Sequence, residues 1–209
     1  MCIRDRKCWM DNLEVDSVIY QPAVNKSWHP LYGERSTVRE AYNEATMYLS
    51  KKDGSNYRLN IEVRAYDEGI AFRYFFPEHP QAIFHKVVGD LTEYTFSPGA
   101  MAWAEQWAQA PFEHLAINDI KQPVERALTV ELSNGLWVAL TDADVDDWCL
   151  TKLVASPTKQ NTLTSVMYSP VDIVTYYATP WKVIMAADKP GELLEHNDIC
   201  LLYTSPSPR

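Results

Sequence analysis

The chain has 209 residues, of which 46% are hydrophobic and 12% aromatic, and its formal net charge is -9. This length fits one domain with a sizeable core, and the apolar content argues against disorder. The acidic residues are spread along the chain, so we expect no nucleic-acid partner, because phosphate binding requires clustered Lys and Arg. No stretch reaches the roughly 20 apolar residues of a membrane helix, and no signal peptide is recognisable, so we expect no membrane contact.

The two ends differ in character from the rest of the chain. Residues 1–6 and 200–209 resemble translated sequencing-adaptor DNA, a contaminant at the edges of genes from short contigs. A natural polar tail is the alternative, because the Ser-Pro-Ser-Pro stretch at 205–208 is ordinary linker composition. We predict that both ends are non-native and that one domain spans residues 7–199.

Alternation of apolar and polar residues with a period of two dominates the interior. In Tyr57–Tyr66 the apolar residues face one way and the charged or amide residues the other, and Asp67-Glu68-Gly69 supplies a turn. Ile70–Phe76 resumes the alternation, which predicts a β-hairpin. A second hairpin is predicted over residues 128–140, with its turn at Ser133-Asn134-Gly135 and its last strand ending at Leu140.

Further strands are expected at short intervals between turn signals. The candidates are Glu14–Tyr20, Val38–Leu49, Ala82–Val88, Leu91–Phe96, Leu163–Tyr168, Ile173–Tyr177 and Trp181–Ala186. The one clear helix start is Pro190-Gly191-Glu192. Many short strands and little helix predict a single all-β antiparallel sandwich.

The densest acidic group follows the second hairpin and comprises Asp142, Asp144, Asp146 and Asp147. Its spacing is that of an EF-hand start, but the Gly at the sixth position and the Glu at the twelfth are missing. One interpretation is a solvated acidic loop. The other is that Asp142, projecting from the end of the strand, supplies one oxygen ligand to a calcium ion that other groups complete.

A cluster of aromatic residues suggests a place for a sugar. Trp103 and Trp107 are followed by Phe112 and Glu113, and pyranose faces pack on indole rings. Tryptophan is equally a good core residue of a sandwich. Trp103, Trp107 and Glu113 are therefore substrate-proximal candidates, with a core role as the alternative. No catalytic residue is identified, because the chain has no nucleophile elbow, no phosphate-binding loop and no HExxH motif.

Five segments carry a family resemblance. They are Ser27–Arg35, Tyr42–Thr46, Arg64–Tyr74, Thr92–Phe96 and Thr179–Ile184. In this order they resemble the Trp-Lys-Pro-x-x-Gly-Glu, Tyr-Asn-Glu-Leu-Thr, Arg-x-Tyr-Asn-Asp-Gly-x-Ala-Phe-Arg-Tyr, Thr-Glu-Phe and Thr-Pro-Trp-Arg stretches of the N-terminal domain of glycoside hydrolase family 97. The resemblance covers nearly all of residues 14–199. Its departures include His29 for Lys, Ala45 for Leu and Lys182 for Arg.

The resemblance implies a domain of a calcium-dependent hydrolase of terminal α-linked glucose or galactose. It implies a galactose-mutarotase-like β-supersandwich that packs on a (β/α)8 barrel, helps to close the active site and supplies part of a calcium site. The catalytic carboxylates lie in the barrel, so none is expected in this chain. The family is mostly bacterial, and we expect the parent protein to be periplasmic or secreted.

The resemblance also gives the acidic segment a role. Leu140–Trp148 resembles a Thr-Glu-Ala-x-Leu-x-Asp-Tyr segment whose Glu is the calcium ligand of this domain, and that Glu corresponds to Asp142. The aspartate side chain is one methylene shorter than that of glutamate.

Two other functions compete with this one. A free-standing carbohydrate-binding or adhesive β-sandwich would have the same fold and no catalytic domain. A mutarotase-like epimerase would need its own catalytic His and Glu, and the scattered histidines give that reading little support.

Overall fold

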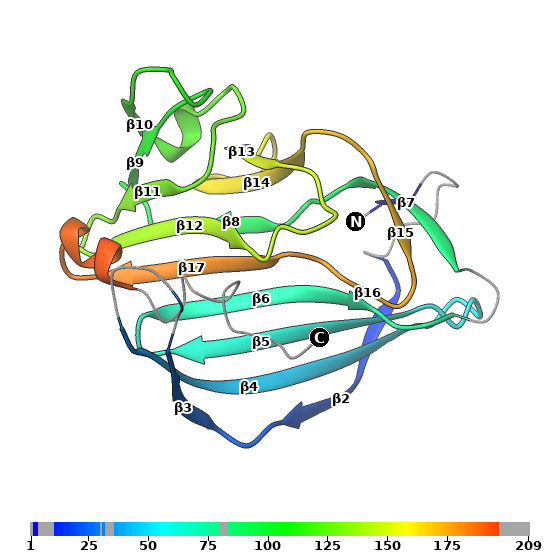
Figure 1. Ribbon diagram of the computed structural model, residues 1–209. Helices are drawn as coiled ribbons and strands as arrows, with labels where there is room; N and C mark the ends of the chain where they lie inside the picture. The colour runs from blue at the N-terminus through cyan, green and yellow to red at the C-terminus, as the bar shows by residue number, and fades with distance from the viewer. Residues whose placement is uncertain (1, 4–10, 30, 32–35, 80–82, 197–209) are drawn as a thin grey trace.

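The computed structural model describes residues 2–3, 11–29, 31, 36–79 and 83–196, and these are mostly β-strand (Figure 1). All strand pairings in this part of the chain are antiparallel. Its helices are two short 3-10 segments, η1 (Ile117–Asp119) and η2 (Pro190–Glu195). The prediction of an all-β antiparallel fold with little helix is confirmed, and the predicted helix start at Pro190 is the first residue of η2.

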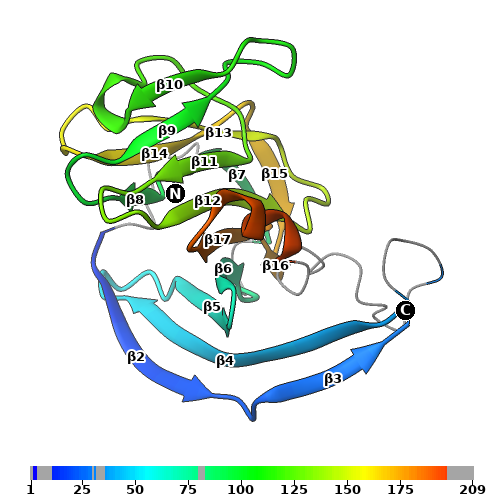
Figure 2. The same cartoon turned by 90° about the vertical axis from the view of Figure 1, so that its left-hand side faces the viewer.

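The largest sheet has 11 strands and forms the body of the molecule. Along its main path the order is β10 (Glu113–Ala116), β9 (Met101–Ala104), β11 (Leu128–Glu131), β12 (Trp137–Ala143), β17 (Trp181–Ala187), β6 (Gly69–Phe76), β5 (Arg58–Tyr66), β4 (Val38–Lys51) and β2 (Leu13–Tyr20). Off this path, β16 (Tyr177–Ala178) pairs with β6, and β3 (Val24–Trp28) pairs with β4. Figure 2 shows β2, β3 and β4 as a long curved edge below β5.

Two small sheets complete the fold, and each has three strands. The first consists of β1 (Cys2–Ile3), β7 (Phe84–Gly89) and β15 (Val171–Val174). The second consists of β13 (Thr151–Ala155), β14 (Thr162–Met167) and β8 (Glu93–Thr95). The β1 pairing brings two residues of the adaptor-like segment 1–6 against β7. Residues 1, 4–6 and 200–209 lie outside the described part of the chain.

The two hairpins predicted from alternation are present. The first is β5–β6, paired from Asn60 opposite Phe75 to Tyr66 opposite Gly69. The second is β11–β12, but its last strand continues to Ala143 instead of ending at Leu140. It continues because all seven residues of β12 pair with β17, from Trp137 to Ala143. Asp142 is therefore a strand residue and does not follow the strand.

The main core lies between the large sheet and the β13–β14–β8 sheet. Its fully buried members include Leu128, Val130, Leu140, Leu153 and Leu163. A second cluster covers the other face of β12, β17 and β6, where Leu193 of η2 packs with Val183 and Met185. The large sheet is therefore covered on both faces along β12 and β17, and each alternate side chain of these strands enters a different environment.

Candidate functional site

Charged and aromatic side chains gather on the face of the large sheet that points away from the main core. They come from four strands, and all but Glu62 belong to three of the five segments that carry the family resemblance. We call this set the arginine–aromatic face, and its members are Tyr42 and Glu44 of β4, Glu62 and Arg64 of β5, Arg73 of β6 and Trp181 of β17. The strand register explains the gathering, because Arg64 is opposite Glu44 across one strand pair and Arg73 is opposite Glu62 across the next.

Arg64 lies between two aromatic rings. Its Cζ atom is 4.4 Å from the centroid of the Tyr42 ring and 4.6 Å from that of Trp181. Its Nε donates a hydrogen bond to Glu44 Oε2 at 2.7 Å. Burial by itself would lower the pKa of Arg64, but Glu44, together with Tyr42 and Tyr66, more than compensates and holds the pKa above its ordinary value. The guanidinium therefore stays charged while it is stacked.

Arg73 repeats the arrangement one strand further along the sheet. Its Cζ atom is 4.4 Å from the Trp181 centroid, and its Nε donates to Glu62 Oε2 at 2.6 Å. Its Nη1 lies 3.8 Å from Asp144 Oδ2. Trp181 is only 2% exposed, and both guanidinium groups lie over its ring. Cation–π contacts of this kind are worth about 0.5–2 kcal/mol each and fix the orientation of the groups.

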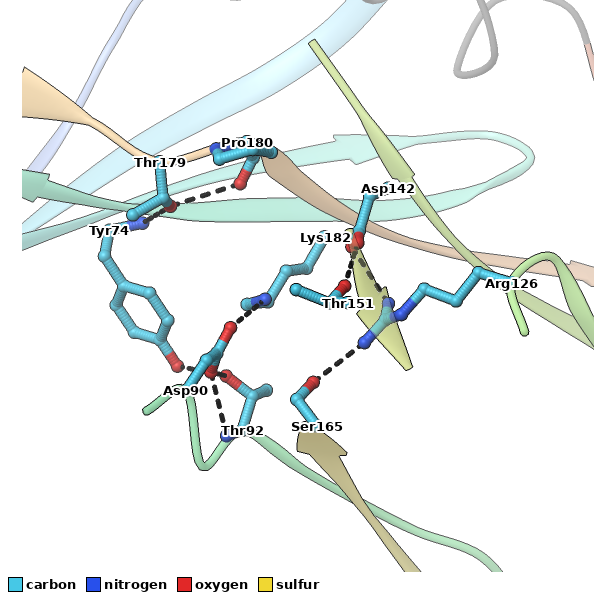
Figure 3. A network of polar contacts seen from close by, with 10 residues as sticks. All are labelled: Tyr74, Asp90, Thr92, Arg126, Asp142, Thr151, Ser165, Thr179, Pro180 and Lys182. Carbon is cyan, nitrogen blue, oxygen red and sulfur yellow. Dashed lines mark hydrogen bonds and ion pairs between the residues drawn. The ribbon is translucent and has the colours of Figure 1, made fainter. Parts of the chain in front are cut away.

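Asp142, the predicted calcium ligand, points to the opposite side of the sheet and into the sandwich (Figure 3). Its Oδ1 accepts a hydrogen bond from Arg126 Nη1 at 2.9 Å, and its Oδ2 accepts a short one from the Thr151 hydroxyl. Its side chain is 13% exposed. The expectation that this carboxylate projects from the sandwich edge is wrong, because β12 continues beyond it and turns it inward.

The surroundings of Asp142 do not fit a calcium ion. Calcium takes 6–8 oxygen ligands, whereas Asp142 Oδ1 is paired with the guanidinium of Arg126 at 2.9 Å. Within the described residues, no group of three or more His, Cys, Asp or Glu side chains is placed to hold a metal. A calcium ion at Asp142 would have to displace an arginine from a buried ion pair.

The other three aspartates of the acidic segment lie in the loop that follows β12. Asp144 and Asp147 have positive φ angles of 58° and 51°. The Tyr177 hydroxyl donates to the backbone oxygens of Asp146 and Asp147, at 3.3 and 3.1 Å. The side chains of Asp146 and Asp147 are exposed, which agrees with the solvated-loop interpretation for these two residues.

The three substrate-proximal candidates lie in and beside the β9–β10 hairpin. Trp103 is 41% exposed and Trp107 is 57% exposed, so neither is a core residue. Trp103 stacks on His114, with ring centroids 4.4 Å apart and an interplanar angle of 16°. Glu113 pairs with Ala104, so its side chain leaves the hairpin on the face opposite to that of Trp103. The fold therefore exposes all three residues but does not bring Glu113 and Trp103 onto one face.

The arginine–aromatic face was not among the predicted site residues. A signal was present in the sequence, since Tyr42, Glu44, Arg64, Arg73 and Trp181 are all residues of the family-like segments. Strand alternation alone assigns each of them to a face, but it does not say which strands are neighbours. The long crossover that places β17 beside β6 supplies Trp181, and single-segment patterns do not predict it.

Solved structures with a similar fold belong to larger enzymes. A glycoside hydrolase family 97 enzyme from Pseudoalteromonas sp. strain K8, as a variant in complex with panose, matches with a TM-score of 0.81 and 21% identity over 88% of this chain and 29% of that chain. The same enzyme in complex with acarbose gives a TM-score of 0.79 and 21% identity over 85% of this chain and 28% of that chain. A β-arabinopyranosidase matches with a TM-score of 0.71 and 18% identity over 85% of this chain and 32% of that chain.

These likenesses define the class of fold as the β-domain found in such enzymes, and this chain spans less than a third of their length. The family model described as glycosyl-hydrolase 97 N-terminal matches residues 3–206. The chain belongs to this family, as the five segments predicted, and it covers the N-terminal domain.

Proposed function

We propose that this chain is the N-terminal domain of a bacterial, periplasmic or secreted α-glycosidase that hydrolyses terminal α-linked glucose or galactose. In this proposal the rest of the polypeptide forms a (β/α)8 barrel with two catalytic carboxylates, one an acid and the other a base or nucleophile. The N-terminal domain packs on the barrel and helps to close its active site. The calcium requirement of the parent protein is met by carboxylates of the barrel.

The arginine–aromatic face is the observation that carries this proposal. Arg, Tyr and Trp are enriched at the centres of protein interfaces, where rigid side chains lose little entropy on binding. Arg64, Arg73 and Trp181 are already fixed by stacking and by two glutamates. Trp181 itself is buried, and the partly exposed side chains are those of the two arginines and their glutamates, at 21–23%. A second domain can therefore dock on charged groups whose positions are already fixed.

The position of η2 supports the same conclusion. This helix is the last described element, and Leu193 packs it against Val183 and Met185 on the side of the sheet that carries Trp181. The side of the sheet that carries the arginine–aromatic face therefore also carries the apolar contacts of η2.

Kinetics of the full-length protein test the proposal. The 209-residue chain alone is expected to give no turnover of p-nitrophenyl α-glucoside or α-galactoside, and the full-length protein is expected to hydrolyse at least one of them. Arg73→Lys in the full-length protein is expected to lower kcat/KM by about 10-fold or more, because lysine keeps the charge but loses the planar stacking and the Nε bond.

Lys159→Ala is the matched control. Lys159 pairs with Glu93 at the exposed side of the small sheet, far from the arginine–aromatic face in the fold, so its loss is expected to leave kcat/KM unchanged. Turnover by the 209-residue chain, or wild-type kinetics for Arg73→Lys, would contradict the proposal.

A free-standing carbohydrate-binding module is the second candidate, and the exposure of Trp103 favours it. The Trp103 ring stacks on His114, and His114 Nε2 lies 3.7 Å from Glu131 Oε2. Titration of the 209-residue chain with panose, followed by tryptophan fluorescence, distinguishes the two. Saturable binding that Trp103→Ala abolishes would support the binding module. No binding at millimolar panose would support the interdomain role.

A further inference from the structure

Two ion pairs lie inside the sandwich where the large sheet meets β8, β13 and β14 (Figure 3). Lys182 Nζ is 2.5 Å from Asp90 Oδ2, and both side chains are less than 5% exposed. Arg126 Nη1 is 2.9 Å from Asp142 Oδ1. Asp142 and Lys182 are direct cross-strand partners in β12 and β17, so the two ion pairs include neighbouring residues of the large sheet.

The partners of these ions belong to the small sheet. Arg126 Nη2 donates to Ser165 Oγ of β14 at 2.8 Å, and the Thr151 hydroxyl of β13 donates to Asp142. Asp90 accepts two bonds from Thr92, the residue that precedes β8. We call the four ions and these three hydroxyl residues the sheet clamp.

We infer that Asp142 is the buried counter-ion of Arg126, that it thereby links the two sheets, and that it does not ligate calcium. The sheet clamp holds two cations and two carboxylates, so it is electrically balanced without a metal. Each oxygen of Asp142 already accepts a hydrogen bond. A calcium ion would leave Arg126, which is 4% exposed, without its counter-ion, and a buried unpaired charge is strongly unfavourable.

The departures of this chain from the family pattern agree with the inference. Asp142 stands where the pattern has Glu, and Lys182 stands where it has Arg. These two positions face each other across β12 and β17. The Asp142 carboxylate contacts Arg126 and Thr151, and the Lys182 ammonium group contacts Asp90.

Thermal unfolding of the 209-residue chain tests the inference, because a ligand that binds the folded state raises Tm only when it is present. Asp142→Asn is expected to lower Tm by about 5–10 °C, equally in EDTA and in millimolar calcium, since it leaves Arg126 without a counter-ion. The control is Asp144→Asn, on the adjoining turn, whose side chain is 42% exposed and which is expected to change Tm by less than about 2 °C. A wild-type Tm for Asp142→Asn in EDTA would overturn the inference.

Calcium binding by the full-length protein gives a second and independent readout. Asp142→Asn is expected to keep the wild-type calcium affinity within about 2-fold, whereas loss of a charged ligand would weaken it by about 10-fold or more. Such a loss would overturn the inference. If Asp142→Asn does not fold, Thr151→Val is the milder variant, and a calcium-independent fall in its Tm is expected. Neither readout depends on hydrolysis, so failure of this inference and failure of the proposed hydrolase are separate results.

Discussion

At the scale of single residues, the interior of this domain contains charges that are stable only as pairs. Burial alone would lower the pKa of Lys182, but Asp90, with smaller contributions from Tyr94 and Asp142, more than compensates and raises it. Burial alone would raise the pKa of Asp90, but Lys182 and Thr92 together hold it below its ordinary value. Both groups are therefore charged at neutral pH. A lysine between the apolar residues of a strand gives no sequence signal of this pairing, because its partner is distant along the chain.

Removing one member of this pair is expected to be costly. Lys182→Met leaves the Asp90 carboxylate buried without its cation and is expected to lower the free energy of unfolding by about 3–5 kcal/mol. The double variant Lys182→Met with Asp90→Asn leaves no charge and is expected to recover more than half of that loss. Urea unfolding of the wild type, Lys182→Met, Asp90→Asn and the double variant measures the coupling, and additive losses would show that the two side chains do not interact.

The same pair determines part of the acid sensitivity of the domain. Because the pKa of Asp90 is lower in the folded state, its contribution to stability is full above the unfolded pKa of about 3.9 and is lost as pH falls through the folded value. Asp90→Asn is expected to be less stable than the wild type at pH 7 but to lose less stability between pH 5 and pH 2. Urea midpoints across this range test it, and parallel curves for the two proteins would refute it.

At the scale of strands and turns, alternation predicts the elements that have one buried and one polar face. The β5–β6 and β11–β12 hairpins have this property, and both were predicted. The edge strand β3 was missed because three of its five residues are exposed and it pairs only with β4. The end of β12 was misplaced because the pattern of one hairpin does not reveal that β17 pairs with it as far as Ala143. For this reason the predicted position of the Asp142 carboxylate, at the edge of the sandwich, was wrong.

One turn position is restricted by the neighbouring strand. At Gly69, the first residue of β6, an added Cβ atom would lie 2.1 Å from the backbone oxygen of Ile184 in β17. Gly69→Ala is therefore expected to force β6 and β17 apart and to destabilise the domain by about 1–3 kcal/mol or more. Gly89→Ala is the control, because a Cβ atom there meets nothing within 4 Å. Equal unfolding free energies for the two variants would contradict this close approach.

At the scale of the whole molecule, the large sheet separates two environments along β12 and β17. The face toward the small sheet holds the apolar core and the sheet clamp, and the other face holds the arginine–aromatic face and η2. The fold and the family could be predicted from the sequence, because alternation and the ordered segments are local signals. The arrangement of side chains on either face could not, because it depends on which distant strands are neighbours in the sheet.

The ends of the chain provide a test of what belongs to this molecule. In the described part of segment 1–6, Cys2 and Ile3 pair with β7, which also pairs with β15 over four residues from Phe84 to Val87. A two-residue strand at the edge of a small sheet contributes little, and the adaptor-like composition of residues 200–209 predicts no packing there. Deleting residues 1–6 and 200–209 together is therefore expected to lower the Tm by no more than about 3 °C, which corresponds to roughly 1 kcal/mol for a domain of this size. Deleting β3, residues 24–28, serves as the positive control, because it exposes β4 along five paired residues. A fall in Tm of more than about 5 °C for the end-deleted chain would mean that these segments are packed and native to the domain.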